Sequence, residues 1–396
     1  MITIEEAKQI ILNSTQKFGV VEVPFLKSIG RVLKENIVAD RDFPPFNRVA
    51  MDGIAIDFYS FHKGQREFLV EGIQPAGSPQ ISLQNSNNCL EVMTGAVLPN
   101  NTNVVIRYED VIIENGVAKI QVEEVKSFQN IHEKGKDRKE ADVLIHQNKI
   151  ISAAEIGVLA TVGKSTVRVA KQPKVMIIST GDELVSTEEK PKPHQIRRSN
   201  VFTLVSFLER IKIKSETDHI TDDKPILKQK IESYLKDYDV LLFSGAVSKG
   251  KFDFLPEVLE ELKVEKLFHR VAQRPGKPFF YGKTSSCNVF GFPGNPISTF
   301  VNCLAYFYPW YFKSLDVEIE EETAILTEDV NFKPNLSYFL QVKLSDKFGH
   351  LLATPIKGNG SGDLASLVNA DAFIELPKTE NIEFKKGDNF PIIRYR

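Results

Sequence analysis

Apolar and polar positions follow two different periods along this chain, and the changes of period divide it into stretches of different structure. Near the start, Thr3 and Glu6 have the spacing of a helix capping box, and apolar residues recur on one face behind them. From about residue 45 to 130 the helical period fades, and Asn115-Gly116 gives a hairpin signal between two β-rich arms. The pattern predicts a helical or mixed segment followed by a small, mostly β domain.

The clearest pattern runs from about residue 173 to 315, where apolar runs alternate with helical segments. Runs such as KVMIIST and DVLLF are typical of buried parallel strands, and the segments between them carry apolar residues at three- and four-residue spacing. This alternation predicts a parallel, doubly wound α/β sheet. The last helix, which opens at GNPISTF, is apolar on nearly every side and is expected to be deeply packed.

The remaining stretches complete a prediction of four domains. Residues 131–172 contain the helix-like run ISAAEIGVLATVG and are expected to return to the first domain, so that the β domain is an insertion. After about residue 320 the strand period returns with turns at Phe348-Gly349 and Lys386-Gly387, which predicts a C-terminal β domain. The predicted boundaries are 1–44 with 131–172 for domain I, 45–130 for domain II, 173–318 for domain III and 319–396 for domain IV.

Composition narrows the class of protein. The 50 basic and 52 acidic residues nearly cancel, which argues against a nucleic-acid partner, so that any anion site must be built locally. The three cysteines share no motif spacing and the seven histidines no paired spacing, so reduced core thiols are expected and a zinc site is not. No apolar run reaches the roughly 18 residues of a membrane span, and acidic residues stand where a signal peptide is basic, so a soluble cytoplasmic protein is expected.

Candidate chemistry lies in loops that follow three of the predicted strands. In a doubly wound sheet, ligands bind beyond the carboxyl ends of the strands. KVMIIST is followed by residues 181–184 (GDEL), DVLLF by 244–253 (SGAVSKGKFD), and SCNVFGF by 293–298 (PGNPIS). Each loop alone is also explained as a structural turn, but their expected convergence on one edge favours a ligand site.

Two neighbouring segments predict an anion site. Asn295 is expected to cap a helix with Pro296 in its first turn, which leaves N–H groups and the Ser298 hydroxyl to cradle an anion. The same residues would also serve simply to start a buried helix. Arg274 and Lys277 lie in a segment stiffened by two prolines, which lowers the entropic cost of holding both cations toward an anion.

Four carboxylates are expected at the same edge, and they indicate a divalent cation. Mg²⁺ beside phosphates takes one or two carboxylates and keeps several waters. Asp222 also stands where a helix N-cap is expected, together with Asp223, and Asp253 is also compatible with the first turn of a helix. The residues alone therefore predict a phosphate-bearing ligand and a Mg²⁺ site, and Walker A, dinucleotide and nucleophile-elbow motifs are absent from the sequence. The carboxylates are Asp182, Glu183, Asp222 and Asp253.

Taken together and in order, the motifs resemble those of the molybdopterin molybdenumtransferases, the molybdate-inserting enzymes that include the E domain of gephyrin. The resemblance covers nearly the whole chain. Its motifs are PPF at 44–46, AMDG at 50–53, TGA at 94–96, STGDEL at 179–184, DD at 222–223, the segment 244–253, PGKP at 275–278, PGNPIS at 293–298 and GSG at 360–362.

The resemblance implies a homodimer of four-domain chains that acts in molybdenum cofactor biosynthesis. Such an enzyme inserts molybdate into adenylylated molybdopterin, requires Mg²⁺ and releases AMP. The resemblance also points to the molybdopterin adenylyltransferase and apo-molybdoenzymes as protein partners.

The resemblance further implies roles for individual residues. Asp222 and Asp253 would handle the metal and the adenylate phosphate, with Asp182 and Glu183 beside them in the catalytic group. Asp52 and Thr94 match positions of the β domain that reach the active site of the opposite subunit. The substrate-binding residues would be Ser244, Gly245, Ser248, Arg274, Lys277, Gly294, Asn295, Ser298, Ser361 and Ser366.

Two other functions stay open at this point. A molybdopterin adenylyltransferase shares the central fold, but it is expected to carry G-G-T-G where this chain reads GAVS at 245–248, and to lack the flanking domains. A non-catalytic binding or scaffold role is the second alternative. A degenerate homologue of the family also stays open, because Ala246 and Gln341 replace a glycine and an arginine that are usual in the family.

Overall fold

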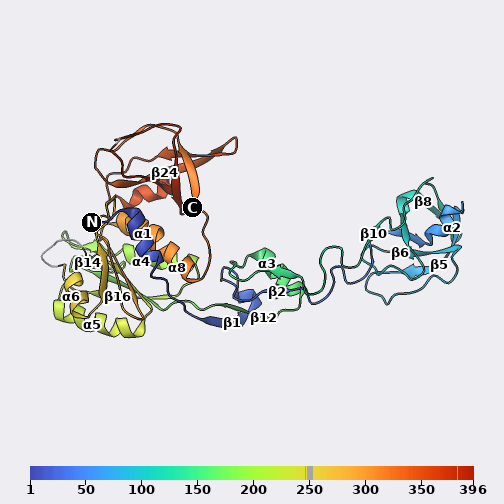
Figure 1. The fold of residues 1–396 in the computed structure, drawn as a ribbon, viewed down its shortest axis with the longest axis horizontal. Helices are drawn as coiled ribbons and strands as arrows, with labels where there is room; N and C mark the ends of the chain where they lie inside the picture. The colour runs from blue at the N-terminus through green and yellow to red at the C-terminus, as the bar shows by residue number, and fades with distance from the viewer. Residues whose placement is uncertain (246, 248–252, 381) are drawn as a thin grey trace. The chain divides into compact units, whose positions relative to one another are not determined.

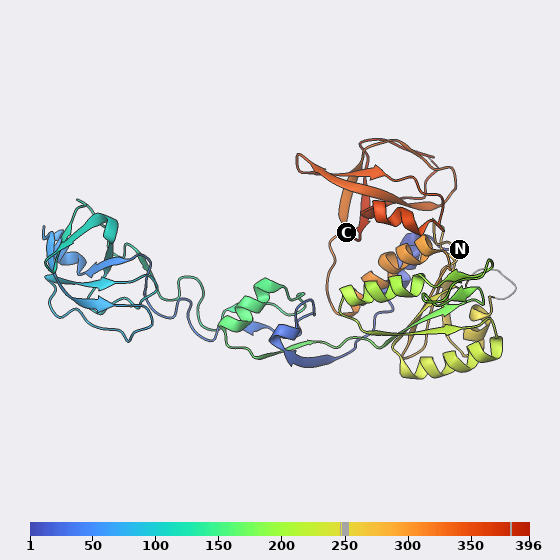
Figure 2. The same cartoon turned by 180° about the vertical axis from the view of Figure 1, so that it is seen from behind.

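The chain folds into two compact units. The structure is a computed structural model that describes residues 1–245, 247, 253–380 and 382–396 (Figure 1, and from behind in Figure 2). Unit 1 comprises Met1–Lys34, Asn148–Ser152 and Thr166–Arg396, and unit 2 comprises Glu35–Gln147 and Ala153–Ser165. Unit 2 is thus inserted in the chain of unit 1. The finer division into four domains with the boundaries given above stays a prediction.

The centre of unit 1 is a six-stranded sheet in the order β16-β13-β17-β21-β20-β18. The first four strands pair in parallel, whereas β20 and β18 join antiparallel at one side. The parallel sheet predicted from the apolar runs is therefore confirmed, and the two antiparallel strands add to it. The bounds are β13 Val175–Thr180, β16 Ser215–Ile220, β17 Val240–Ser244, β18 Glu265–His269, β20 Phe280–Lys283 and β21 Asn288–Phe292.

Helices cover both faces of this sheet. Successive residues of a strand point to opposite sides, so each apolar strand has two faces that must be buried. Ile177 and Leu242 pack on one face with residues of α1, α4, α7 and α8. Ile178 and Phe243 pack on the other face with residues of α5 and α6. The sheet is therefore doubly wound. The helices are α1 Ile4–Leu12, α4 Asn200–Arg210, α5 Lys224–Asp237, α6 Leu255–Glu261, α7 Pro296–Asn302 and α8 Tyr308–Ser314, with a π-helical turn at Cys303–Phe307.

Two local predictions for these helices are confirmed. Thr3 and Glu6 form the capping box of α1 through reciprocal hydrogen bonds of 3.1 and 2.8 Å. The segment from α7 to α8 is deeply packed, and Phe307 and Trp310 are fully buried within it. Among the described residues, no helix has both the length and the apolar character needed to cross a membrane.

The C-terminal part of unit 1 is a closed ring of five strands. The strands follow the order β24-β25-β22-β28-β26, and β26 pairs back onto β24. The short β19 joins β24 in parallel from outside the ring and carries Arg274. The bounds are β19 Gln273–Arg274, β22 Glu322–Leu326, β24 Ser337–Lys347, β25 His350–Pro355, β26 Ala372–Leu376 and β28 Asn389–Arg394, with a further pair, β23 Val330–Asn331 and β27 Glu383–Phe384.

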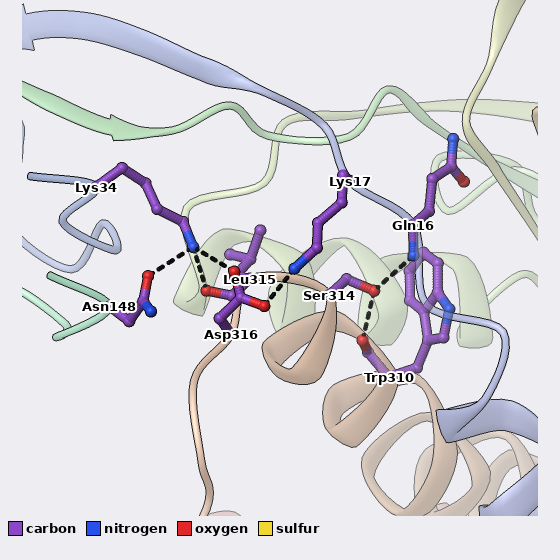
Figure 3. A network of polar contacts seen from close by, with 8 residues as sticks. All are labelled: Gln16, Lys17, Lys34, Asn148, Trp310, Ser314, Leu315 and Asp316. Carbon is purple, nitrogen blue, oxygen red and sulfur yellow. Dashed lines mark hydrogen bonds and ion pairs between the residues drawn. The ribbon is translucent and has the colours of Figure 1, made fainter.

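The N-terminal segment of unit 1 is tied to the end of α8 by a polar network (Figure 3). The Asp316 carboxylate accepts hydrogen bonds from the ammonium groups of Lys17 and Lys34, and Lys34 also donates to the carbonyl of Leu315 at 2.6 Å and to Asn148 at 2.8 Å. These contacts join segments that are far apart in sequence. The two strands nearby, β1 Val20–Pro24 and β12 Thr166–Ala170, pair antiparallel.

Unit 2 is built on its own six-stranded sheet in the order β7-β4-β6-β5-β9-β8. Its hairpin β8–β9 turns at Asn115 and Gly116, whose φ angles of 50° and 80° are positive, as the Asn-Gly signal predicted. The mostly β character predicted for this stretch is therefore confirmed. The elements of the unit are β2 Ile37–Val38, β3 Arg48–Val49, β4 Gly53–Ile56, α2 Phe58–His62, β5 Glu67–Gln74, β6 Asn88–Val92, β7 Val104–Arg107, β8 Val111–Glu114, β9 Val117–Ile120, β10 Ile131–His132, β11 Val143–Ile145 and α3 Ala153–Thr161.

Candidate functional site

Three strand ends lie side by side at one edge of the central sheet. Ser179 of β13 is in register with Ser244 of β17, and Ser244 is in register with Phe292 of β21. Because these strands are parallel, the loops that follow them leave the sheet at the same edge. The convergence that the sequence predicted is therefore present.

A cavity of about 660 Å³ lies over these strand ends, and we call it the carboxylate cavity. It is lined by candidate residues from all three loops, and Arg197 and Arg198 also lie in its wall. Arg197 ends β15 Ile196–Arg197, which pairs with β14 Leu184–Val185, and Arg198 follows it; the sequence reasoning did not consider either arginine. The candidate residues in the wall are Glu183, Asp222, Ser244, Gly245, Asp253, Gly294 and Asn295.

The carboxylates of this cavity influence one another. Burial raises the pKa of Asp222, and the negative charges of Asp182, Glu183 and Asp253 raise it further. Asp182 is tied to the same loop, because its Oδ1 accepts the backbone N–H of Asp222 at 3.1 Å. The four carboxylates named from the sequence are thus close enough to interact.

The structure also separates Asp222 from its neighbour. Asp223 is the N-cap of α5, and its carboxylate accepts the N–H of Ile226 at 2.9 Å. Asp222 makes no cap, so of its two alternatives the capping role is wrong. Asp253 precedes both α6 and its N-cap residue, Phe254, and therefore does not lie in the first turn.

The wall at Ser244 is held by a residue that the sequence reasoning missed. Asn200, the first residue of α4, donates from Nδ2 to Ser244 Oγ and to the carbonyl of Gly294, each at 2.8 Å. It thereby clamps two strand-end loops together. Its only sequence signal is its place at the start of a helix, where asparagine is common.

Gly245 leaves β17 with a φ of +110°, a conformation that favours glycine. A Cβ built on this residue would lie 2.9 Å from Thr180 Oγ1. That hydroxyl is buried and has no hydrogen-bond partner in the described part of the chain. Glycine is therefore required here for both backbone conformation and space. Ser248 and Ala246 lie outside the described residues.

A second cavity, of about 390 Å³, adjoins the first, and we call it the cation cavity. It contains the two predicted cations, Arg274 and Lys277, together with the Ser298 hydroxyl. Asn295 belongs to both cavities, as do Pro278 and Pro293. Its wall includes Arg274, Lys277, Asn295, Ser298, Gln341 and Ser361.

The segment that carries the two cations is fixed by buried amides. Gln273 Nε2 donates to Asn302 Oδ1 at 2.7 Å and to the carbonyl of Pro275 at 3.0 Å, and the Tyr306 hydroxyl donates to Gln273 Oε1. Gly276 allows this arrangement, because a Cβ there would come within 2.6 Å of Asn302 Oδ1. Gln273 and Asn302 were missed from the sequence because they are 29 residues apart.

The predicted cap at Asn295 is wrong in its detail. Asn295 is the N-cap residue of α7, but its side chain makes no cap hydrogen bond and Nδ2 donates to Ser361 Oγ at 3.0 Å. The N–H of Ile297 is also engaged, because it donates to the carbonyl of Ser361 at 3.1 Å. The loop of Ser361 thus takes up hydrogen-bonding groups that the sequence assigned to an anion cradle, and it places Ser361 in the cavity wall.

Three further candidate residues are not among the residues that line these two cavities. Ser366 is buried and donates to the carbonyl of Asp363 at 2.7 Å, beneath the loop of Ser361. Asp52 and Thr94 belong to unit 2, where the N–H of Thr94 donates to Asp52 Oδ1 at 2.5 Å. This hydrogen bond lowers the pKa of Asp52 and keeps it ionised. Their predicted roles stay predictions.

The carboxylate cavity fits a Mg²⁺ ion that keeps most of its water. Among the described residues, no group of three or more histidine, cysteine, aspartate or glutamate side chains is placed to hold a metal ion by itself. Mg²⁺ takes one or two carboxylates and completes its shell with water and phosphate oxygens. Asp222 and Asp253 provide such a pair in one wall, and burial and the neighbouring carboxylates raise the pKa of Asp222.

Models of known families match consecutive parts of the chain. They are described as "MoeA N-terminal region (domain I and II)" at residues 2–163, "Probable molybdopterin binding domain" at 176–310 and "MoeA C-terminal region (domain IV)" at 323–395. The chain is also 40% identical over 396 residues to a molybdopterin molybdenumtransferase of Synechocystis sp., with 99% of both chains covered. The chain belongs to the molybdopterin molybdenumtransferase family.

Other relatives extend the likeness to molybdopterin molybdenumtransferases over the full length. The enzyme of that name from Staphylococcus aureus is 30% identical over 404 residues, with 99% of this chain and 95% of the relative covered. The solved structure of a molybdopterin biosynthesis moeA protein from Pyrococcus horikoshii OT3 has a TM-score of 0.86 at 27% identity, with 100% of both chains covered. The predicted fold class is therefore confirmed: a central doubly wound α/β part with a mixed helical part, an inserted β part and a C-terminal β part.

Proposed function

We propose that this protein inserts molybdate into adenylylated molybdopterin, in a Mg²⁺-dependent reaction that releases AMP. Its place in molybdenum cofactor biosynthesis follows from its family. One observation carries the finer proposal: a cavity with carboxylates adjoins a cavity with two cations, and Asn295 lies in both walls. A phosphate-rich substrate needs a site for a divalent cation beside a site for its anionic groups.

The carboxylate cavity is the proposed site of the adenylate. Asp222 and Asp253 would hold Mg²⁺, which would supply charge neutralisation at the phosphates. Asp182 fixes the loop of Asp222 through its backbone N–H. Ser244 and Gly245 present small groups to the ligand, so that its phosphates can approach the backbone closely.

The cation cavity is the proposed site of molybdate and of the pterin phosphate. Arg274 offers a planar fork that can bind an oxyanion through two N–H groups, whereas Lys277 offers a point charge. Ser298 adds a hydroxyl donor in the same wall, and it is almost fully buried. These residues recognise a tetrahedral oxyanion, and molybdate is bound here as substrate.

The bond to be broken is the phosphoanhydride between the pterin phosphate and AMP. Water adds to one phosphorus atom and the bridging P–O bond breaks, so that the bridging oxygen leaves with the other phosphate. The products are AMP and a phosphate monoester of the pterin. Molybdenum is inserted without a change of oxidation state: the two dithiolene S–H groups form two Mo–S bonds, and one oxygen of molybdate leaves as water with their two protons. The protons of the water consumed in the hydrolysis are released to solvent or to a carboxylate of the cavity. Glu183 and Asp182 are the proposed acceptors, because they lie beside Asp222 and Asp253.

We further propose a cytoplasmic homodimer in which Asp52 and Thr94 of one protomer complete the site of the other. Asp52 is an exposed carboxylate held by the N–H of Thr94, so it can accept hydrogen bonds from a substrate. A molybdopterin adenylyltransferase would supply the substrate, and apo-molybdoenzymes would take up the product.

The experiment combines purified protein, MgCl₂, sodium molybdate and adenylylated molybdopterin, and follows AMP by chromatography. We expect AMP release that depends on both molybdate and Mg²⁺, and activation of an apo-molybdoenzyme by the product. The Asp253→Asn variant should lose most of this activity while remaining folded.

AMP release that is equal with and without molybdate would contradict the proposal. The outcome would also separate the alternatives. An adenylyltransferase would form adenylylated molybdopterin from ATP and molybdopterin, whereas a binding or scaffold protein would retain the pterin without releasing AMP.

A further inference from the structure

A separate group of cations lies at the opposite, amino edge of the central sheet. Val175 of β13 is in register with Ser215 of β16 and with Val240 of β17. Lys174 and Lys214 immediately precede two of these strands, so the parallel pairing brings them to the same edge. The carboxylate and cation cavities lie at the other ends of the strands, and this group is therefore distinct from them.

Two more cations reach the same place from neighbouring segments. Lys212 follows α4 in a left-handed conformation, with a φ of 63°, and its stem lies against Gly30, where a Cβ would come within 3.0 Å of Lys212 Cε. Arg31, the next residue after Gly30, donates from Nη2 to the carbonyl of Ala170 at 2.6 Å. The backbone thus holds Lys212 and Arg31 close together.

These four cations line a cavity of about 310 Å³, which we call the amino-edge cavity. Glu216 contributes the carboxylate of this wall, and it accepts a hydrogen bond from the Tyr238 hydroxyl at 2.8 Å. Within the described part of the chain, none of the four cationic groups forms an ion pair with a carboxylate, although the Asp239 carboxylate accepts the backbone N–H of Lys174 at 2.8 Å. Four positive side chains therefore face one negative side chain. The cations are Arg31, Lys174, Lys212 and Lys214.

Arg31 gives a second, independent indication of an anion site. Its Nε is buried, and over the described residues it has no hydrogen-bond partner. Partial burial lowers the pKa of its guanidinium. Arg31 as a whole is half-buried, and a buried N–H donor without a partner costs free energy unless a ligand satisfies it.

We propose that the amino-edge cavity binds a small phosphate-bearing anion. Arginine and lysine together provide the fork and the point charges that phosphate groups require. The volume is at the lower end of the range for small-molecule sites, and Pro173 and Tyr238 supply an apolar wall beside the cations. A macromolecular partner is less favoured, because the cations line a concave site and the chain as a whole has a net charge of −2.

The test is lysine footprinting with pyrophosphate as the probe. Purified protein is acetylated briefly with and without pyrophosphate, and each lysine is quantified by mass spectrometry. We expect acetylation of Lys174, Lys212 and Lys214 to slow at least about threefold, in a saturable manner, because an anion of this size would contact several of them at once. Lys277 reports separately on anion binding in the cation cavity. A lack of binding in the amino-edge cavity is therefore distinguishable from a lack of binding in the cation cavity.

Variants decide whether the protection belongs to this cavity. Lys212→Gln with Lys214→Gln should abolish protection of Lys174 and leave protection of Lys277 unchanged. The control, Lys126→Gln with Lys136→Gln, removes the same charge from exposed positions of unit 2. It should change the protection of neither Lys174 nor Lys277.

Three results would overturn the proposal. They are the absence of protection at Lys174, Lys212 and Lys214, protection of Lys174 that persists in the double variant, and protection by an acidic peptide but not by pyrophosphate. Thermal unfolding of each variant checks that it is folded, and the footprint of the unsubstituted protein tests the proposal without any variant.

Discussion

Two adjacent aspartates of the candidate site carry opposite energetic roles. Asp223 stabilises α5 through its cap hydrogen bond to the N–H of Ile226. Asp222 lies in the wall of the carboxylate cavity among three other carboxylates, which raise its pKa. A carboxylate whose pKa is raised by folding destabilises the folded state at neutral pH, because its charged form is disfavoured there.

We therefore predict opposite shifts in thermal stability for substitutions at the two positions. Asp222→Asn should raise the unfolding midpoint at pH 7.5 without added metal, by about 1–2 °C, while abolishing most of the molybdate-dependent AMP release. Asp223→Ala should lower stability by about 1 kcal/mol through loss of the cap. Scanning fluorimetry and the AMP assay measure both effects.

The pH dependence of the stability of Asp222→Asn gives a control for this prediction. As the pH falls through the raised pKa of Asp222, that carboxyl becomes neutral, so the stability difference between Asp222→Asn and the unsubstituted protein should shrink. A midpoint for Asp222→Asn below that of the unsubstituted protein at pH 7.5 would show that its charge is compensated in the folded state.

At the scale of elements, the site depends on how tightly the strand-end loops pack. Gly245 and Gly294 approach each other closely, since a Cβ on Gly294 would lie 3.8 Å from Gly245 Cα. Their constraints nevertheless differ. Gly245 has a φ of +110° and faces Thr180, whereas a Cβ on Gly294 would meet only ordinary van der Waals contact.

We predict that Gly245→Ala lowers stability by about 1–3 kcal/mol and reduces AMP release, because alanine is strained at this φ and its Cβ crowds the Thr180 hydroxyl. Gly294→Ala is the control and should change stability by less than about 0.5 kcal/mol. Thermal and urea unfolding measure both. Equal effects of the two substitutions would show that the strand-end conformation at Gly245 is relaxed.

The same loops show what the sequence can and cannot predict. The strands β13, β17 and β21 were predictable because each is a short, continuous apolar run, and parallel pairing then fixes which loops converge. The hydrogen-bond partner of Asn295 was not predictable, because Ser361 lies 66 residues later in the C-terminal part. Side-chain bonds between distant segments leave no periodic signal, which is also why Gln273 and Asn200 were missed.

At the scale of the whole molecule, Asp316 joins segments that are nearly 300 residues apart. Hydrogen bonds from Lys17 and Lys34 lower the pKa of the Asp316 carboxyl. Such a group adds stability above the unfolded-state pKa, and the stability is lost as the pH falls through the lower folded-state pKa. Asp316 has a φ of 57°, which asparagine tolerates well.

We predict that Asp316→Asn lowers the unfolding midpoint at pH 7, with a cost of less than about 1 kcal/mol per lost pair because the groups are partly exposed. The cost should fall at high salt, and it should shrink as the pH falls through the lowered pKa of Asp316. A double-mutant cycle with Lys34→Met measures the coupling, and strictly additive effects would contradict an interaction between these side chains.

The proposed exchange of Asp52 between protomers makes a second prediction at this scale. Asp52→Ala and Asp253→Asn should each be inactive alone, but equal mixtures after subunit exchange should regain about a quarter of full activity. Mixed dimers would contain one complete site and one site with both defects. Mixtures that stay inactive, although mass spectrometry shows mixed dimers, would place both residues in the site of the same protomer.

The ring of the C-terminal part closes in an order that differs from the order of synthesis. β28, Asn389–Arg394, pairs on both sides, with β22 and with β26, although it follows all other strands of the ring in sequence. A nascent chain therefore cannot close the ring until β28 has left the ribosome. Because Tyr338 to Gln341 of β24 line the cation cavity, a prematurely terminated chain would lack the closed ring that supports this wall of the proposed anion site.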